Sequence, residues 1–179
     1  MNKIASILLF VAIVSASDAF ADPAAEPKTA EIVDIPAKFA DSGITAGNVK
    51  ITFTDGHTET LTHKGNCTKP HVLAGGIVGW VHFTALDQRG YALNDTLQLR
   101  FPDGRTKEFK PNHEAPFILD WGLADHGSSV VIESMQHHGP PYFIRYDLKS
   151  GRITGTVNIY LPYDKLPPWA QPLSDEKPR

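Results

Sequence analysis

The chain has a single cysteine, Cys67, among its 179 residues. One thiol cannot form a disulfide within the chain, so an exported domain of this sequence must be held together by its apolar core. We interpret Cys67 as a small apolar side chain of that core. The alternatives are a free thiol and a disulfide bond to another chain. A small scaffold stapled by internal disulfides is therefore excluded.

The sequence also lacks any block of basic residues. Its 17 Lys and Arg residues are slightly outnumbered by 20 Asp and Glu residues, which gives a formal net charge of −3. Proteins that bind nucleic acid or an anionic membrane surface carry clustered positive charge. The charge pattern therefore predicts no nucleic-acid partner and leaves a protein or a small ligand.

Two further absences concern helices and catalysis. No window of eleven or more residues shows apolar residues with the 3.6-residue period of an amphipathic helix. The motifs Gly-x-Ser-x-Gly and His-Glu-x-x-His do not occur, and neither does a phosphate-binding glycine loop. These absences exclude a helical domain and favour a non-enzymatic function.

What is present begins with a pattern typical of export. Lys3 precedes the apolar run Ile4–Val14, and Ala19-Phe20-Ala21 matches a small-x-small cleavage pattern. Together these features indicate a secretory signal peptide, and the apolar run is too short to span a bilayer. We therefore expect cleavage after Ala21 and a periplasmic or secreted protein with no membrane span after cleavage.

The rest of the chain is typical of β-strands separated by tight turns. Between residues 117 and 154, three apolar strands are expected at Phe117–Trp121, Ser129–Ser134 and Tyr142–Leu148, with a turn containing Gly or Pro after each. Such alternation predicts an antiparallel meander. The other expected strands are Val49–Thr54, His57–Thr62, Gly75–Thr84, Asp95–Phe101, Arg105–Phe109 and Arg152–Leu161. Loops are expected at His63–Pro70, Ala85–Asn94 and Lys110–Ala115. The fold class is therefore all-β.

Two flanking segments complete the expected organisation around an all-β domain at residues 48–161. Residues 22–47 begin with a stretch rich in Ala, Pro and Glu and predict an extended lead-in that docks Ile32, Val33 and Ile35 onto the sheet. Residues 162–179 contain five prolines, which exclude the interior of a helix or sheet. Trp169 is the residue expected to attach this proline-rich tail to the domain.

Three expected hairpin turns recur at nearly constant spacing. Gly56, Gly104 and Gly151 follow one another at intervals of 48 and 47 residues, and a period of about 40–50 residues is typical of β-propeller blades. The segments WGLADHGSSVVIES and FIRYDLKSGRIT resemble the repeat of TolB-like, WD40-like propeller blades, and HTETLTHKGNCTKPHV resembles the linker between such blades. The resemblance spans about Val49–Thr156. It implies a blade-like scaffold and transfers no active site.

The number of repeats limits what such a scaffold can form. Two full repeats, His63–Lys110 and Pro111–Leu161, and the half repeat Val49–Thr62 are too few to close a ring of blades. We favour an open sandwich of two packed sheets, equivalent to a partial propeller. An oligomer that completes a ring and a chance spacing of turns remain as alternatives.

Histidine is the residue type that suggests chemistry, with eight in the chain. Imidazole is a common metal ligand, and His63, Cys67 and His71 lie four residues apart in the sequence. That spacing would suit a soft or borderline divalent metal if the segment were helical, but Gly, Asn and Pro within it indicate a loop. This trio is the candidate metal site.

The candidate ligand site lies at a strand end instead. His137 and His138 precede a Gly-Pro-Pro turn, which is where rigid scaffolds display functional groups, and Tyr142 follows it. Trp121 is a candidate for stacking against a ligand, although Trp80 and Trp121 are first expected to fill the core.

The sequence therefore predicts an exported, non-enzymatic β-rich domain that binds an envelope protein or a small ligand. Its loops Ala85–Asn94 and His137–Pro141 are the expected contact regions. Asp120 and Glu133 are candidate buried acids. The alternative is a metal-binding protein or a metal-dependent enzyme that uses surface histidines. No cofactor is implied apart from the divalent metal of that alternative.

Overall fold

The structure is a computed structural model that describes residues 25–40, 45–86, 92–136, 139–158 and 162–173. Two predictions fall outside these residues. They are the export signal at residues 1–21 and the pair His137 and His138.

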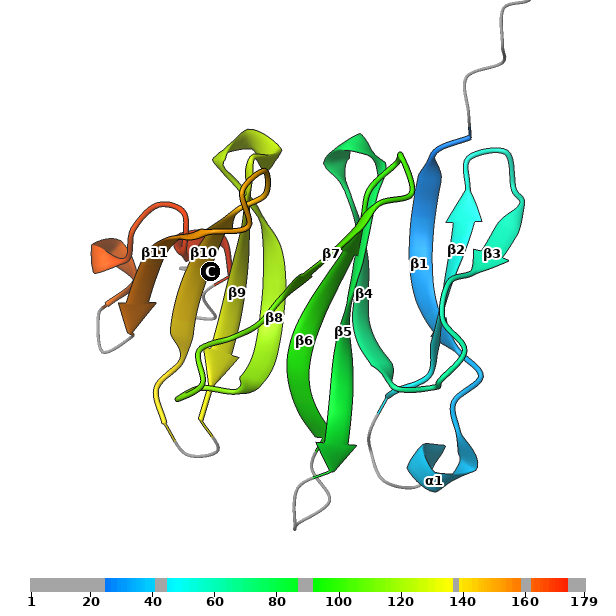
Figure 1. Cartoon of the computed structure of the whole chain (residues 1–179), viewed down its shortest axis with the longest axis horizontal. Helices are drawn as coiled ribbons and strands as arrows, with labels where there is room; N and C mark the ends of the chain where they lie inside the picture. The colour runs from blue at the N-terminus through cyan, green and yellow to red at the C-terminus, as the bar shows by residue number, and fades with distance from the viewer. Residues whose placement is uncertain (1–24, 41–44, 87–91, 137–138, 159–161, 174–179) are drawn as a thin grey trace, which may run out of the picture.

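The strands form three antiparallel sheets that stand side by side (Figure 1). Sheet A contains β1 (Pro27–Val33), β2 (Asn48–Phe53) and β3 (Thr58–Thr60). Sheet B contains β4 (Cys67–Leu73), β5 (Ile77–Leu86), β6 (Ala92–Arg100) and β7 (Thr106–Phe109). Sheet C contains β8 (Phe117–Ala124), β9 (Ser129–Met135), β10 (Tyr142–Asp147) and β11 (Ile153–Asn158). Helical structure is limited to α1 (Ala37–Ala40) and the 3₁₀ turns η1 (Ala74–Gly76), η2 (Asp125–Gly127), η3 (Tyr163–Lys165) and η4 (Gln171–Leu173) within the described ranges. The all-β prediction is confirmed.

Sheets B and C are meanders with the same plan. In each sheet the four strands pair in chain order, and a 3₁₀ turn, η1 or η2, joins the first strand to the second. A glycine with positive φ, Gly104 in sheet B and Gly151 in sheet C, lies in the turn between the third and fourth strands. Sheet A has the same kind of turn at Gly56 between its last two strands. Glycine adopts this backbone conformation without steric cost, which explains the regular spacing of the three turns.

The apolar core lies between the sheets in two layers. Strand β5 is buried on both faces, because Ile77 and Val81 point toward sheet C while Val78 and Trp80 point toward sheet A. The layer between B and C is completed by Leu97, Leu99, Phe109, Ile118, Trp121, Val130, Ile132 and Leu148. The layer between A and B is completed by Val49, Ile51 and Cys67. Both Trp80 and Trp121 are core residues, as predicted.

The outer faces of sheets A and C are covered by different groups. The outer face of sheet C is covered by the C-terminal tail, whose Leu166 and Ala170 pack on Val131 and Phe143. The outer face of sheet A carries an ion pair between Lys50 Nζ and Glu31 Oε1 at 2.6 Å. In the part of the chain that the structure describes, neither face presents an apolar surface that a further sheet would have to cover.

Three sequence expectations are corrected. Residues 27–33 are not a lead-in but the strand β1, in which Ile32 pairs with Val49 and packs on the core while Ile35 beyond it is 46% exposed. Strand β1 pairs with the half repeat Val49–Thr62 to form a third sheet, whereas the expected sandwich had two sheets. The expected loop at residues 63–70 is partly strand, because β4 begins at Cys67. Both ends of the expected loop at residues 85–94 are strand, because β5 extends to Leu86 and β6 begins at Ala92, and residues 87–91 lie outside the described residues.

Pro70 explains why the start of β4 looked like a loop. Proline cannot donate a ladder hydrogen bond, so it is confined to edge strands and bulges. Strand β4 is the edge of sheet B, and its pairing with β5 breaks between Thr68 and His71. Lys69 takes a positive φ of 50° at this bulge.

Candidate functional site

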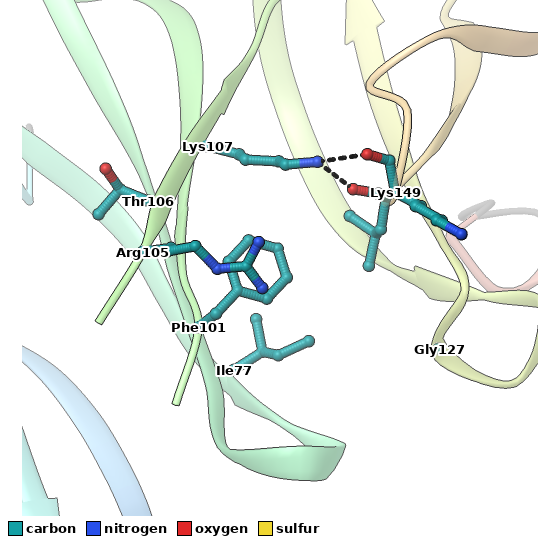
Figure 2. Close-up of a pocket in the computed structure, with 8 residues that line it drawn as sticks. Ile77, Phe101, Arg105, Thr106, Lys107, Gly127 and Lys149 are labelled. Atoms are coloured by element: carbon teal, nitrogen blue, oxygen red, sulfur yellow. Dashed lines mark hydrogen bonds between the residues drawn. The ribbon is translucent and has the colours of Figure 1, made fainter. Parts of the chain in front are cut away.

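A pocket of about 460 Å³ lies between sheets B and C. It is bordered by the β6–β7 hairpin on one side and by η2 and the β10–β11 turn on the other. We call it the inter-sheet pocket, and its lining residues are Ile77, Phe101, Arg105, Thr106, Lys107, Gly127, Leu148 and Lys149. Figure 2 shows Ile77 and Phe101 across the pocket from Gly127 and Lys149. A ligand held here would contact both sheets.

The walls of the inter-sheet pocket are largely apolar. Ile77 begins β5 and Leu148 follows β10, and these residues are only 9% and 8% exposed because they belong to the core between B and C. Phe101 follows β6 and packs against the same core. Concave apolar sites with a few polar groups are typical of small-molecule binding.

Lys107 links the two sheets at this pocket. It lies on the same face of β7 as the core residue Phe109, so its side chain points toward sheet C. Its ammonium group donates hydrogen bonds to the carbonyl oxygen of Leu148 and, at 2.9 Å, to that of Lys149 (Figure 2). An ammonium group has three N–H donors, so one donor remains for a ligand.

Arg105 is held in place by the Asp103-Gly104 turn. The Asp103 carboxylate accepts hydrogen bonds from the Arg105 backbone N–H at 3.0 Å and from its Nε at 2.6 Å. The backbone bond and then the guanidinium bond lower the pKa of Asp103. The guanidinium lies 5.9 Å from the centre of the Phe101 ring (Figure 2). Its terminal amino groups therefore stay beside the apolar wall.

The opposite wall is built on an unusual turn. Asp125, His126 and Gly127 have φ values of 52°, 56° and 87°, so three successive residues are left-handed. This conformation costs roughly 1–2 kcal/mol for each non-glycine residue. Ser128 Oγ donates to the Asp125 carbonyl oxygen at 2.8 Å, and Arg145 Nη1 lies 3.2 Å from the Asp125 carboxylate. These two contacts hold the turn in a conformation that residues other than glycine seldom adopt.

A second polar site lies where β4 passes β8. We call Lys69, His71, Asp120 and Glu133 the acid–histidine cluster; with Leu119 they line an open pocket of about 440 Å³. Bulges in both strands, between Thr68 and His71 and between Ile118 and Asp120, create the space. None of the five lining residues carries a hydroxyl or thiol nucleophile.

The charges of the acid–histidine cluster are arranged as pairs. Asp120 and Glu133 face each other across β8 and β9, and Glu133 is only 4% exposed. His71 Nε2 lies 3.7 Å from Asp120 Oδ1, which also accepts the Trp121 backbone N–H at 2.8 Å. The neighbouring imidazole of His71 and then the Trp121 N–H lower the pKa of Asp120, although partial burial opposes them. The cluster thus brings an imidazole of sheet B to 3.7 Å from a carboxylate of sheet C.

The lowered pKa of Asp120 predicts a pH-dependent contribution to stability. This contribution is present above the pKa of the unfolded chain and is lost as pH falls through the lower folded pKa. We expect Asp120→Asn to lower the free energy of unfolding at pH 7 by less than about 1 kcal/mol, because the carboxylate is nearly half exposed. In urea denaturation the difference between the variant and the native chain should be smaller at pH 2.5 than at pH 7. Asp164→Asn, at an exposed carboxylate, is the control. An unchanged difference at both pH values would contradict the role of His71.

The candidate metal trio does not converge. Cys67 is fully buried between sheets A and B, where its Sγ lies 3.5 Å from His82 Nδ1, and burial raises the pKa of its thiol. His71, beyond the bulge, faces Asp120 on sheet C. His63 lies in the connection before β4. Among the described residues, no three His, Cys, Asp or Glu side chains form a group that could hold a metal ion.

The candidate ligand residues are also dispersed. Trp121 is 2% exposed, and its indole N–H donates to the Lys69 carbonyl oxygen at 3.0 Å, so it offers no face for stacking. Tyr142 begins β10, and its hydroxyl accepts a hydrogen bond from Asn158 Nδ2 at 3.1 Å. His137 and His138 lie outside the described residues. Among the described candidates for ligand or metal binding, His71 and Trp121 lie together, with ring centres 5.1 Å apart, and His71 also lies beside the candidate acid Asp120.

None of the residues that line the inter-sheet pocket was a candidate in the sequence. The available signal was weak: two basic residues follow the Asp103-Gly104 turn at alternating positions, and another, Lys149, lies in the corresponding turn of the next repeat. No family model matches the chain, and no curated protein is significantly similar to it. No helix within the described ranges is long and apolar enough to cross a membrane.

Proposed function

We propose that the chain is an exported, non-enzymatic β-rich binding domain that holds a small ligand in the inter-sheet pocket. The observation that carries this proposal is the pocket itself: its volume of about 460 Å³ lies in the range of about 300–1,000 Å³ typical of ligand sites. Its walls are apolar, and two of its polar groups are anchored, Arg105 by Asp103 and Lys107 by backbone carbonyls. Such preorganisation lowers the entropic cost of binding.

Export and the scaffold are parts of the same proposal. Lys3, the apolar run Ile4–Val14 and the Ala19-Phe20-Ala21 pattern support removal of a signal peptide. The shared plan of sheets B and C supports a relation to the blade-like repeats of TolB-like proteins, whose number here is too small for a ring. An envelope location would place the pocket where it meets periplasmic or extracellular small molecules.

A metal-dependent function has less support. In the candidate metal trio Cys67 is buried between sheets A and B while His71 faces Asp120 on sheet C, and the acid–histidine cluster contains one imidazole, 3.7 Å from the Asp120 carboxylate. The proposal therefore concerns the inter-sheet pocket alone.

The proposal predicts ligands that stabilise the native chain through this pocket. In a thermal-shift screen of small molecules, a ligand at 100 times its dissociation constant should raise the melting temperature by about 5–10 °C. Ile77→Trp, which fills the pocket from one wall, should abolish that shift. Ile153→Trp is the matched control, because Ile153 is 56% exposed on the edge strand β11.

The melting temperature of each variant without ligand shows whether it still folds. If Ile77→Trp does not fold, Phe101→Ala replaces it, since loss of the ring removes one wall of the pocket. Ligands that stabilise the native chain and both pocket variants equally would place binding elsewhere and reject the proposed site.

A further inference from the structure

We infer that the inter-sheet pocket is selective for an organic anion, with a carboxylate or phosphate group bound by Arg105 and Lys107, with Lys149 adding positive charge beside them, and with an apolar body against Ile77 and Phe101. This inference rests on the proposed binding function and names the chemical class of its ligand.

The first argument is the charge of the lining. Three of the eight lining residues are cationic and none is a carboxylate. The nearest acids in the turns are already engaged: Asp103 binds Arg105, and Asp147 accepts hydrogen bonds from the backbone N–H and the hydroxyl of Ser150, each at 2.6 Å. Asp103 offsets the charge of Arg105, and the Asp147 carboxylate, which stays charged and acts on Lys107, offsets a second. One of the three positive charges of the lining therefore stays unbalanced, and a neutral or cationic ligand would not offset it.

The second argument is the number of hydrogen-bond donors that remain for a ligand. Lys107 uses two of its three donors on the carbonyl oxygens of Leu148 and Lys149. In the described part of the chain, Arg105 uses Nε for Asp103, and its terminal amino groups have no hydrogen-bond partner. The ammonium of Lys149 likewise has no hydrogen-bond or ion-pair partner among the described residues. Planar guanidinium amino groups match the oxygens of a carboxylate or phosphate.

The third argument is the distribution of polar and apolar groups. Figure 2 shows Lys107 spanning the pocket toward the turn that carries Lys149, whose side chain points away from Arg105, with Phe101 and Ile77 on the side of Arg105. The cations thus border an apolar wall made by Phe101, Ile77 and Leu148. A simple ion such as phosphate would leave that wall in contact with water. An anion attached to an apolar chain or ring would cover it.

The fourth argument is the fixed position of two of these cations. Asp103 holds both the backbone and the side chain of Arg105, and Lys107 is tied to sheet C. Because these side chains are already ordered, binding an anion costs little additional rotamer entropy. Asp103 is therefore a positioning residue for Arg105.

The test uses four probes that share one body and differ in their head group. They are octanoate, octyl phosphate, octanol and octyltrimethylammonium, each kept below its micelle-forming concentration, with inorganic phosphate as a head group alone. Dissociation constants are measured by isothermal titration calorimetry on the mature chain. We expect at least one of the two anions to bind about tenfold or more tightly than octanol, and the cation and free phosphate to bind most weakly. The preferred anion distinguishes a carboxylate from a phosphate ligand.

Arg105→Gln and Lys149→Gln should each weaken binding of that anion about tenfold without changing the affinity for octanol. Both residues are on the surface, so folding should be retained. Arg152→Gln and Lys28→Gln are matched controls at exposed positions outside the pocket and should have no effect. Raising the salt concentration should weaken binding of the anion and leave the affinity for octanol unchanged.

Two outcomes would overturn the inference. If octanol binds as tightly as both anions, or if Arg105→Gln and Lys149→Gln leave the anions unaffected, the pocket is not anion-selective, while the proposed binding function stands. If none of the four probes binds, the anion inference fails. The library screen with Ile77→Trp then decides separately whether the pocket binds any small molecule.

Discussion

Replacing Gly79 with alanine is expected to lower the free energy of unfolding by about 3 kcal/mol. Gly79 lies in β5, at the centre of the array. A Cβ atom at this position would lie 2.3 Å from Trp121 Cη2 and 2.5 Å from Leu99 Cδ2. Both neighbours are buried in the layer between B and C, at 2% and 0% exposure. Neither side chain can move without opening the core, because protein interiors are close-packed.

The control is Gly122→Ala in β8. There the nearest atom to the added Cβ is Leu173 Cδ2 at 3.3 Å, the end of a flexible side chain in the tail. Its cost should stay below about 1 kcal/mol, and loss of glycine entropy in the unfolded chain should partly offset it. Urea denaturation of both variants measures the difference.

A second variant tests whether Trp121 is the cause. Trp121→Phe removes the ring atoms that approach Gly79 most closely, although it leaves a cavity of its own. The double variant Gly79→Ala, Trp121→Phe should therefore cost clearly less than the sum of the two single changes. Strict additivity, or a Gly79→Ala variant as stable as the native chain, would show that sheets B and C are farther apart than described.

The same contact shows how far the sequence predicts the fold. Alternation in the expected strands and the glycine turns at Gly56, Gly104 and Gly151 locate most strands and the meander order, because both depend on residues close in the chain. Sequence periodicity does not reveal why β5 has a glycine opposite Trp121. That requirement comes from the packing of two sheets whose residues are about 40 positions apart.

The sequence misses strands where a local signal conflicts with the tertiary structure. Pro70 and a positive φ at Lys69 are typical of a loop, yet this segment forms β4 because it pairs with β5. Residues 27–33 look like a polar lead-in because only Ala30 and Ile32 pack on the core. Strand β1 forms because it pairs with the free edge of β2. The sequence of β1 itself does not predict this pairing.

The candidate site was harder to predict than the fold for the same reason. Histidine suggests a site because of its residue type alone. In the structure most of the described histidines lie apart from one another. The inter-sheet pocket is formed by residues from Ile77 to Lys149 on both sheets. Arg105, Lys107 and Lys149 are ordinary surface residues in the sequence. They become a group because equivalent turns of two consecutive repeats meet at one end of the sandwich.

Removing the C-terminal tail is expected to have the other large effect. Leu166 and Ala170 are 3% and 0% exposed against the outer face of sheet C, where Val131 and Phe143 are equally buried. Trp169 also packs there, and the guanidinium of Arg145 lies 5.2 Å from its ring centre. The prediction that Trp169 attaches the tail is therefore confirmed. A chain that ends at Pro162 should lose more than about 3 kcal/mol of stability, since a buried Leu→Ala change alone costs about 2–5 kcal/mol.

Loss of the tail should also change the association state. It would expose an apolar sheet face on C, and exposed apolar patches promote self-association. Urea denaturation and analytical ultracentrifugation would measure the two effects. Leu166→Ala should lower the free energy of unfolding by about 3 kcal/mol. Lys165→Ala, at an exposed neighbour, should change the free energy of unfolding by less than about 0.5 kcal/mol. A truncated chain that remains monomeric and as stable as the native chain would mean that sheet C needs no cover, and that a proline-rich segment packs there without stabilising the fold.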